Sequence, residues 1–297
     1  MANYLTSGYN TDQGANYTKD FYNLTNTGTY AKNGILTYNY TGGSIDDTGV
    51  ASADWRYLYD EAFKYINATL GITFNEDQGL LADIELTDNA SGAFNSNKGK
   101  IEAENLITEY SRLNITPGFS DPSDFGGYAW STVVHELGHT LGLGHQGNYN
   151  GDVNFSEEAV FANDSWDISM MSYINQTENP NFTGRTYTDS STFKAADLLA
   201  LDDLYASQGY GTSNAFTGDT TYGHNTTITD GTSAIWNQFT TWIDTTGFTI
   251  ADGAGTDTID FSGFSANQQL DLRAAEASST SPYYSTINGR ENNLSIA

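Results

Sequence analysis

The chain has 297 residues, a length typical of about two domains of roughly 150 residues each, and its 13% of aromatic residues excludes a disordered chain. Its 11 Lys and Arg against 37 Asp and Glu give a formal net charge of −26, which excludes a phosphate-binding nucleic-acid surface. No run reaches the length of about 18 apolar residues that a membrane span needs, and the lack of cysteine excludes disulfides, thiolate zinc sites and a cysteine nucleophile.

The excess of carboxylates has two interpretations: a solvated acidic surface, or a set of which some members bind divalent cations. We expect a solvated surface for most of them, because only a few carboxylates can be ligands at once. The first ten residues, MANYLTSGYN, contain neither the basic nor the apolar region of an ordinary secretory signal.

The first half of the chain predicts a mixed sheet with a long helix on one face. Residues 1–33 are polar and poorly periodic, and we expect a processing or docking segment there. Apolar residues at helical spacing predict a helix over 52–70, with Ser52 as its N-cap. Alternation of apolar and polar residues predicts strands at 34–40, 71–75 and 82–87, and another near 100–107.

The second half begins with a turn-rich stretch and then a helix from about 128 to 143. A long irregular stretch, 144–190, separates this helix from a third one near 192–206. From residue 209 onward Gly, Thr and Asp alternate with apolar residues, which predicts a β-rich segment. The predicted fold class is therefore α+β, with one domain over 34–208 and a β-rich segment over 209–297.

Three of the four histidines lie within the eleven residues 135–145, which read HELGHTLGLGH. His135 and His139 are four residues apart on the predicted helix, so both imidazoles project from one face and can bind one metal ion. Gly142 allows a left-handed turn that ends the helix and brings His145 back as a third ligand. Three imidazole nitrogens and one water form an open zinc site of the catalytic kind.

Glu136 lies on the adjacent face of this helix and can reach a metal-bound water without being a ligand. The pattern therefore predicts a general base beside a metal ion. A histidine on its own is more often a structural residue, and we interpret the fourth, His224, as a surface residue.

The sequence at this point resembles the metzincin metalloproteases, whose HExxHxxGxxH signature is followed by a Met-turn. Residues 169–173 read SMMSY, which is similar to the Met-turn of the serralysins. Met171 matches the Met-turn methionine, a structural floor beneath the zinc, and Tyr173 matches the tyrosine that follows it. The resemblance covers most of the chain from about residue 34 and implies a metzincin-like catalytic domain followed by the start of a β-roll.

The resemblance also implies a mechanism. Zinc would lower the pKa of its bound water, and Glu136 would take the water proton and pass it to the leaving amine. Tyr173 would bind the resting zinc, then swing away and donate a hydrogen bond to the oxyanion. The plainer interpretation makes Met171 a core methionine and Tyr173 a packed aromatic residue.

Structural calcium is implied at the entry to the β-rich segment. Residues 217–223 and 252–264 are similar to the start of the calcium-binding β-roll of the serralysins. Calcium prefers oxygen ligands, and the resemblance implies the side chains of Asp252 and Asp257 with the carbonyl groups of Phe216, Gly218, Thr220, Ala254 and Gly255. The alternative is an ordinary turn between two strands.

Three features depart from the serralysin pattern. Gln146 replaces the proline that usually follows the third histidine. A single clear GxGxD unit occurs, at 253–257, where the family has a tandem series. The sequence ends at NLSIA, so we expect a form truncated or processed before most of the calcium-binding repeats.

Three functions compete. The first is a secreted, extracellular, monomeric zinc endopeptidase that acts on proteins or peptides and has no nucleic-acid partner and no membrane span. The second is a non-catalytic, calcium-dependent binding or adhesion module that kept a metal site. The third is a protease that residues 1–33 hold inactive by steric blocking. The presence of Glu136 favours an enzyme, because a retired protease tends to lose its general base.

Overall fold

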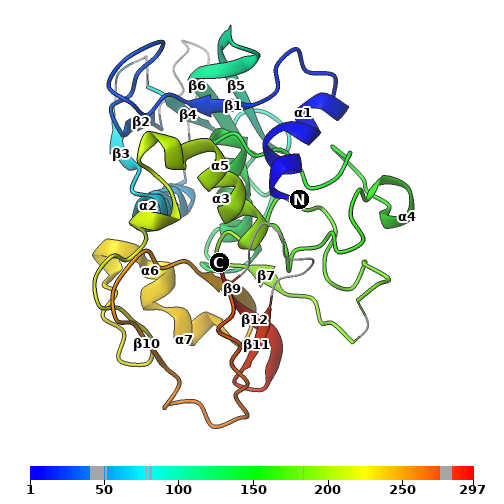
Figure 1. The fold of residues 1–297 in the computed structure, drawn as a ribbon, viewed down its shortest axis with the longest axis vertical. Coiled ribbons are helices and arrows are strands. Elements are labelled where there is room, and N and C mark those ends of the chain that lie inside the picture. The colour runs from blue at the N-terminus through cyan, green and yellow to red at the C-terminus, as the bar shows by residue number, and fades with distance from the viewer. Residues whose placement is uncertain (41–49, 51, 78, 80–81, 183, 275–282) are drawn as a thin grey trace.

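The computed structural model describes residues 1–40, 50, 52–77, 79, 82–182, 184–274 and 283–297. Its main sheet has six strands in the order β1-β6-β4-β2-β3, with β5 also paired to β6 (Figure 1). All pairs in this sheet are parallel except the antiparallel pair of β5 with β6. The strands are β1 (Asp20–Tyr22), β2 (Ile35–Asn39), β3 (Thr73–Glu76), β4 (Ile84–Thr87), β5 (Ala93–Glu102) and β6 (Asn105–Ile115).

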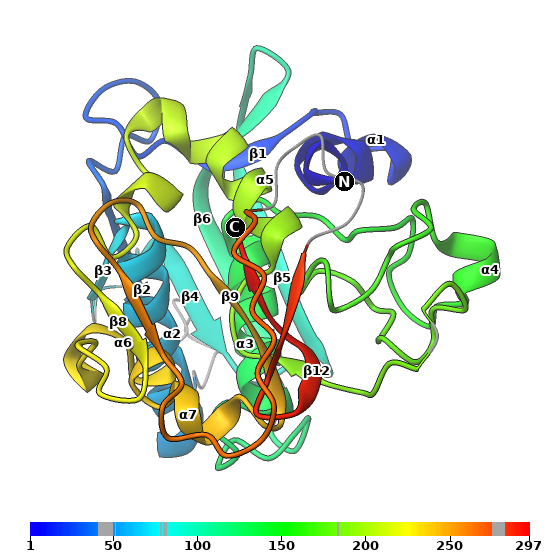
Figure 2. The same ribbon diagram turned by 60° about the horizontal axis from the view of Figure 1, so that its bottom comes forward.

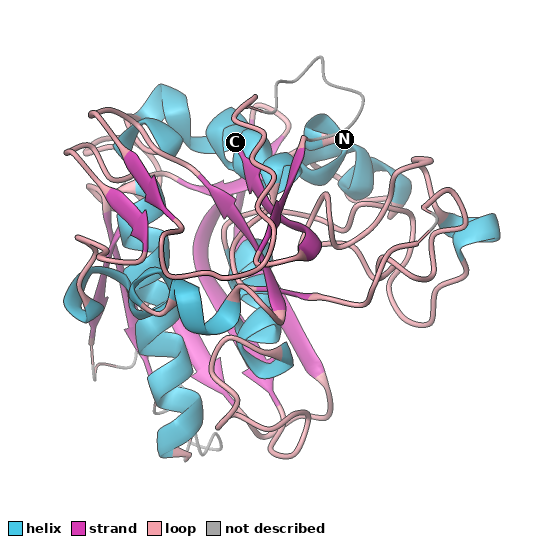
Figure 3. Cartoon of the chain, turned by 90° about the horizontal axis from the view of Figure 1, so that it is seen from below, coloured by secondary structure: helices cyan, strands magenta, loops and turns pink. Residues whose placement is uncertain are grey.

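Two long helices, α2 (Ala53–Leu70) and α3 (Tyr128–Thr140), contact each other and this sheet. Figure 3 shows helices lying across one face of the strands. The side chain of Ser52 accepts a hydrogen bond from the N–H of Trp55, so the predicted N-cap of α2 is confirmed. The apolar stripe of α2 that the sequence predicted is buried from Leu58 to Leu70, whereas Ala53 at the start of the helix is exposed. Helix α3 carries His135, Glu136 and His139.

The N-terminal residues form a short π-helix, η1 (Tyr4–Gly8), which continues into α1 (Tyr9–Asp12). The main-chain carbonyl of Leu5 accepts a hydrogen bond of 2.7 Å from the N–H of Gly144, in the loop that follows α3. Leu5 is fully buried. Residues 1–33 therefore contribute to the core and support the loop that carries His145, whereas their processing remains a prediction.

The segment from 144 to 188 is largely without regular structure, as predicted, and lies on one side of the molecule in Figures 1 and 2. It contains the single turn α4 (Phe155–Glu158) and leads to β7 (Asp189–Ser190) and α5 (Ala195–Tyr205). The remaining elements are η2 (Ala206–Gln208), η3 (Thr212–Asn214), β8 (Thr221–Gly223), α6 (Asp230–Asn237), α7 (Phe239–Trp242), β9 (Thr246–Ile250), β10 (Thr258–Asp260), β11 (Tyr284–Ile287) and β12 (Arg290–Ile296).

The C-terminal segment shares a sheet with the part of the chain that precedes it. Strands β11, β12, β9 and β7 form a four-stranded sheet in that order, and β8 pairs with β10. Strand β7 precedes residue 208 and β9 follows it, so their pairing connects the two segments. One hydrophobic cluster also includes residues of both segments, from Leu5 to Leu294. The two segments are therefore packed into one core, and the domain boundary near 208 remains a prediction.

The predicted helices and most of the predicted strands are present, and the mixed α and β fold class is confirmed. The strand expected near 100–107 is instead the tip of the long β5–β6 hairpin, which turns at Ala103 and Glu104. Helices α6 and α7 lie in the segment where the sequence predicted strands. Within the described part of the chain, no helix is both long and apolar enough to cross a membrane.

Candidate metal centre and active-site cleft

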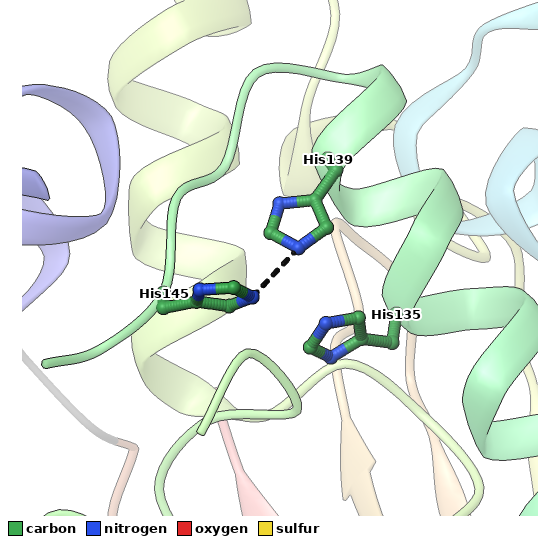
Figure 4. Close-up of side chains that lie close together, drawn as sticks. All are labelled: His135, His139 and His145. Carbon is green, nitrogen blue, oxygen red and sulfur yellow. Dashed lines mark hydrogen bonds between the residues drawn. The ribbon is translucent and has the colours of Figure 1, made fainter. Parts of the chain in front are cut away.

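Three histidines converge at the C-terminal end of α3. Figure 4 shows the imidazoles of His135 and His139, both from α3, facing that of His145 from the following loop. The Nε2 atoms of His139 and His145 are 3.0 Å apart, and one ring nitrogen from each histidine lies within 4.8 Å of the others. Two imidazole nitrogens on one tetrahedral zinc ion are about 3.3 Å apart, so this arrangement fits a zinc ion.

Gly142 makes this convergence possible. Its φ of +97° is in the left-handed region, and a Cβ atom there would lie 2.0 Å from the main-chain oxygen of Asp20. The N–H of Leu143 donates to the carbonyl of Gly138 and closes the helix end. The chain therefore turns sharply after α3 and returns His145 to the face that carries the other two histidines, as predicted.

Main-chain carbonyl groups orient all three rings. The Nδ1 atoms of His135, His139 and His145 lie 2.7, 2.6 and 2.8 Å from the carbonyl oxygens of Met170, Leu143 and Tyr149, respectively. Because a carbonyl oxygen only accepts hydrogen bonds, each Nδ1 carries the proton and each Nε2 presents its lone pair to the centre of the group.

The three rings are also kept neutral. Burial lowers the pKa of His135 to about 4, and burial together with the neighbouring His135 lowers the pKa of His139 to about 3. Burial and the other two histidines hold the pKa of His145 well below its ordinary value. Neutral imidazole is the form that binds metal ions, so the site is prepared for a cation at pH 7.

Glu136 extends from α3 into the same region. Its side chain is 5% exposed, its Oε2 atom is buried without a hydrogen-bond partner, and burial raises its pKa to about 8. A nearby positive charge favours the ionised form of a carboxyl group. A cation held by the histidines therefore makes Glu136 a stronger acid and leaves a carboxylate free to accept a proton.

A cleft of about 840 Å³ opens onto this group and is large enough for a peptide segment. Exposed aromatic rings of Phe119 and Tyr128 stack along one wall, with centroids 6.3 Å apart. None of the described residues that line the cleft is a lysine or arginine. The lining residues are Gly92, Ala93, Phe119, Tyr128, Ser131, Thr132, His135, Glu136, Gly151, Asp152, Val153, Trp166, Met170, Ser172, Tyr173, Glu178 and Ser190.

Met171 lies beneath α3 and is fully buried. A Cβ atom at Gly138 would be 2.7 Å from its Sδ, so only glycine allows the helix to approach this closely. Asp197 of α5 stabilises the turn that contains Met171. Its carboxylate accepts hydrogen bonds from the Oγ of Ser169 and, at 2.7 Å, from the N–H of Met170. The sequence did not single out Asp197, and its position in the first turn of a helix was the one available signal.

Tyr173 lies beside the histidines. Its ring centroid is 4.3 Å from that of His145 and 5.8 Å from that of His135, and it lines the cleft. Burial, followed by the negative charge of Glu136, raises the pKa of its phenol. A tyrosine in this place can donate a hydrogen bond to an anion that forms beside the histidines.

The seven residues expected to bind calcium lie together in one loop cluster. The Oγ1 atom of Thr220 is 3.0 Å from the carbonyl oxygen of Gly218 and 3.4 Å from that of Phe216. The N–H of Thr220 donates to Asp257 over 2.9 Å, and that of Ala254 donates to Asp252 over 3.3 Å.

Gly255 lies close to the loop that contains Gly218, since a Cβ atom at residue 255 would lie 2.5 Å from the carbonyl oxygen of Gly218. Burial raises the pKa of Asp252, Tyr222 lowers it by hydrogen bonding, and the neighbouring Asp257 raises it. Two adjacent carboxylates and several carbonyl oxygens form a donor set suited to a hard cation.

The structure also describes the surroundings of two further residues that the sequence analysis discussed, His224 and Gln146. His224, interpreted as a surface residue, is only partly buried and packs against Phe264, with ring centroids 4.6 Å apart. Gln146, at the position of the expected proline, is fully buried, and neither polar atom of its side chain has a hydrogen-bond partner.

The chain is similar to known metalloproteases. Residues 212–297 match the family described as Peptidase M10 serralysin C terminal. Metallopeptidase AprA of Pseudomonas marginalis is 36% identical over 179 residues, which are 59% of this chain and 34% of that protein. Serralysin C of Dickeya chrysanthemi is 33% identical over 204 residues, which are 63% of this chain and 35% of that protein. The chain thus spans about a third of the length of these curated relatives.

A looser likeness links the structure to a solved protease. High choriolytic enzyme 1, a hatching-enzyme zinc protease from Oryzias latipes, has 15% sequence identity and a TM-score of 0.35, covering 59% of this chain and 92% of that chain. This likeness is too distant to support an argument about the site.

Proposed function

Because the chain belongs to the serralysin-type metzincins, we propose that it is a zinc-dependent endopeptidase that hydrolyses peptide bonds in proteins. The observation that carries the proposal is the group of three converging Nε2 lone pairs beside the unpartnered carboxylate oxygen of Glu136, next to a peptide-sized cleft that His135 and Glu136 line. A protein substrate, an extracellular location and a monomeric state belong to the same proposal.

His135, His139 and His145 would hold the zinc. A zinc ion supplies Lewis acidity there, lowering the pKa of a water molecule and polarising the scissile carbonyl. Glu136 takes the proton of the attacking water and later passes it to the leaving amine, which needs a carboxylate without a competing hydrogen-bond partner. Tyr173 would be a further ligand at rest, and its hydroxyl would donate a hydrogen bond to the negatively charged oxygen that develops on the substrate.

The test is hydrolysis of casein by the purified chain, with its zinc content measured on the same sample. We expect about one zinc per chain, activity that a chelator removes, and recovery on adding zinc. Stable zinc binding without any hydrolysis would instead favour the non-catalytic binding module.

Tyr173→Phe should lower kcat by roughly 10²-fold, equivalent to about 2.7 kcal/mol, with little change in KM. The reason is that the hydroxyl acts on an anion that is absent from the ground state, while the ring and its contact with His145 are kept. Steady-state kinetics on one peptide, with zinc measured in parallel, provide the test.

The matched control is Tyr128→Phe, which removes a hydroxyl from the same cleft. This control should keep kcat close to that of the wild type. If a zinc-loaded Tyr173→Phe enzyme also keeps its kcat, Tyr173 does not stabilise the oxyanion.

We also propose that calcium binds the loop cluster formed by Asp252 and Asp257 with Phe216, Gly218, Thr220, Ala254 and Gly255. Support comes from the convergence of their oxygen atoms and from the neighbouring carboxylates of Asp252 and Asp257. Strand β8 begins directly after this cluster and β10 directly after Asp257, so a bound ion would fasten both strands.

Calcium should protect the segment from residue 209 onward against proteolysis more than the rest of the chain, because an ion that binds the folded state alone stabilises it by mass action. Limited proteolysis in calcium and in a calcium-selective chelator, followed by mass spectrometry of the fragments, measures this difference. Asp257→Asn keeps an acceptor for the N–H of Thr220 but should abolish the protection.

Asp271→Asn is the control, since Asp271 lies in the same segment and pairs with Arg273 outside the cluster. It should behave as the wild type does. Cleavage patterns that do not change with calcium in the wild type would remove calcium from the proposal.

A further inference from the structure

Tyr149 links the third histidine to Tyr173, although nothing in its sequence context marks it. It lies in the loop after α3, is 2% exposed, and its main-chain carbonyl accepts the hydrogen bond from Nδ1 of His145. Its ring stacks against His145, with centroids 5.7 Å apart and planes inclined by 28°. The residue therefore contacts this histidine through both main chain and side chain.

The same ring lies against Tyr173. The two phenol rings stack with centroids 5.2 Å apart and planes inclined by 26°. The N–H of Tyr173 donates to the hydroxyl oxygen of Tyr149 over 3.3 Å. Tyr149 thus packs against one face of the Tyr173 ring and binds the main-chain N–H of the same residue.

A buried carboxylate fixes the Tyr149 hydroxyl. It donates to Asp164, whose two oxygens lie 3.2 and 3.1 Å away. Asp164 is fully buried and also accepts a 2.6 Å hydrogen bond from Oγ of Ser172, the residue before Tyr173. Because the hydroxyl proton is committed to Asp164, its oxygen lone pair is left for the N–H of Tyr173.

Glycine provides the space for this arrangement. A Cβ atom at Gly147 would be 2.3 Å from the ring of Tyr149. The ring can therefore lie against the main chain of residue 147 only when that residue is glycine. The N–H of Tyr149 also donates to the carbonyl of Gly147 over 2.9 Å. The position of the ring is therefore set by the loop before any metal binds.

We propose that Tyr149 is a positioning residue that holds Tyr173 in its resting orientation and fixes its distance from His145. This inference rests on the proposed role of Tyr173 at the zinc site. Groups that orient ligands from outside the metal site typically change metal affinity or activity by about 10–100-fold when they are replaced. Tyr149→Phe should therefore lower kcat by about tenfold, because the main chain of Tyr173 is loosened while the stacked ring remains.

The experiment combines spectroscopy with a double-mutant cycle on the full chain. Copper(II) in place of zinc gives a phenolate-to-copper charge-transfer band if Tyr173 is a ligand, and Tyr173→Phe defines the spectrum without it. We expect Tyr149→Phe to weaken or shift this band. In the Tyr173→Phe background, Tyr149→Phe should cost almost nothing more in kcat, because residues that act through one another are not additive.

Tyr65→Phe is the matched control. Tyr65 is also a buried tyrosine whose hydroxyl accepts a main-chain N–H, that of Phe193, and its ring packs on Trp130 and Phe193 instead of on the histidines. It should leave the copper spectrum unchanged. Tyr149→Phe could fold poorly, because Asp164 loses a hydrogen-bond donor. In that case the double variant Tyr149→Phe/Asp164→Asn, which also removes the buried charge of Asp164, is measured in its place.

The outcomes separate the two proposals. If the wild type and Tyr173→Phe give the same copper spectrum, Tyr173 is not a ligand. The kinetic double-mutant cycle would then decide the role of Tyr149. A band present in the wild type and unchanged in Tyr149→Phe, or an undiminished tenfold loss in the Tyr173→Phe background, would overturn Tyr149 as the positioning residue.

Discussion

Glu136→Gln should remove nearly all peptidase activity, by roughly 10²- to 10⁴-fold, while the protein keeps its fold and its zinc. The amide has the shape of the carboxyl group but cannot take a proton from water, and proton transfer by a positioned base contributes about this factor. Zinc should stay because the lone pairs that would hold it belong to three histidines, each oriented by a main-chain carbonyl.

The same substitution should not destabilise the metal-free protein. The carboxyl of Glu136 is buried, its Oε2 has no hydrogen-bond partner, and burial alone raises its pKa to about 8. A neutral amide avoids the cost of burying a charge there. Activity would thus depend on a group that contributes nothing to stability, and the melting temperature of the metal-free variant should equal or exceed that of the wild type.

Glu61→Gln is the matched control for this experiment. Glu61, on α2, is also 5% exposed and has a buried Oε2 without a partner, but it pairs with Lys64. It should keep full activity. Casein hydrolysis, zinc analysis and thermal melts on the three proteins complete the test, and near-normal turnover by Glu136→Gln would exclude it as the general base.

The metal centre could be predicted from sequence because its geometry is local. A four-residue spacing on one helix places His135 and His139 together, and a single glycine in the left-handed region returns His145. The pattern needs no knowledge of distant segments. For the same reason the start of α2 could be predicted, since Ser52 acts within the first turn of the helix that it caps.

The partners that hold this centre come from elsewhere in the chain. Tyr149 and Asp164 lie in a segment without regular structure, and Asp197 reaches the Met-turn from α5. Leu5 supports the loop between α3 and His145 from the N-terminal segment. These contacts depend on long-range packing, which neither periodicity nor residue spacing reports.

The β5–β6 hairpin was misjudged because its local signals are weak. It turns at Ala103 and Glu104, whose φ values of +46° and +66° are of the kind usually given by Asn-Gly. Strand β5 is only partly buried along its length, so its sequence lacks a clear alternation. Helices α6 and α7 are short and depend on the burial of Trp236 and Phe239 in the core more than on helix propensity.

His145→Ala should abolish activity and strongly lower the affinity for zinc, because two histidines make an incomplete zinc site. The loss of affinity should exceed the roughly 10–100-fold that follows the replacement of a residue that only orients a ligand. His145 is the proposed ligand that the loop supplies; it is 3% exposed, and its ring contacts those of Tyr9 and Tyr173. Its removal also frees Tyr149 of its hydrogen bond from Nδ1. We therefore expect the dialysed variant to lose its zinc while the rest of α3 stays folded.

Thermal melts separate this loss from unfolding. A ligand at a hundredfold excess over its Kd stabilises the folded state by about 2.7 kcal/mol, so the wild type should melt at a lower temperature after chelation. His145→Ala should melt at the same temperature with and without the chelator, close to that of the metal-free wild type. His224→Ala, which removes the histidine packed on Phe264 in the C-terminal segment, should instead keep its zinc, its activity and its sensitivity to the chelator. A dialysed His145→Ala protein that still holds one zinc per chain at full activity would show that the metal is bound without the third histidine, and the geometry of the centre would have to be rebuilt around other ligands.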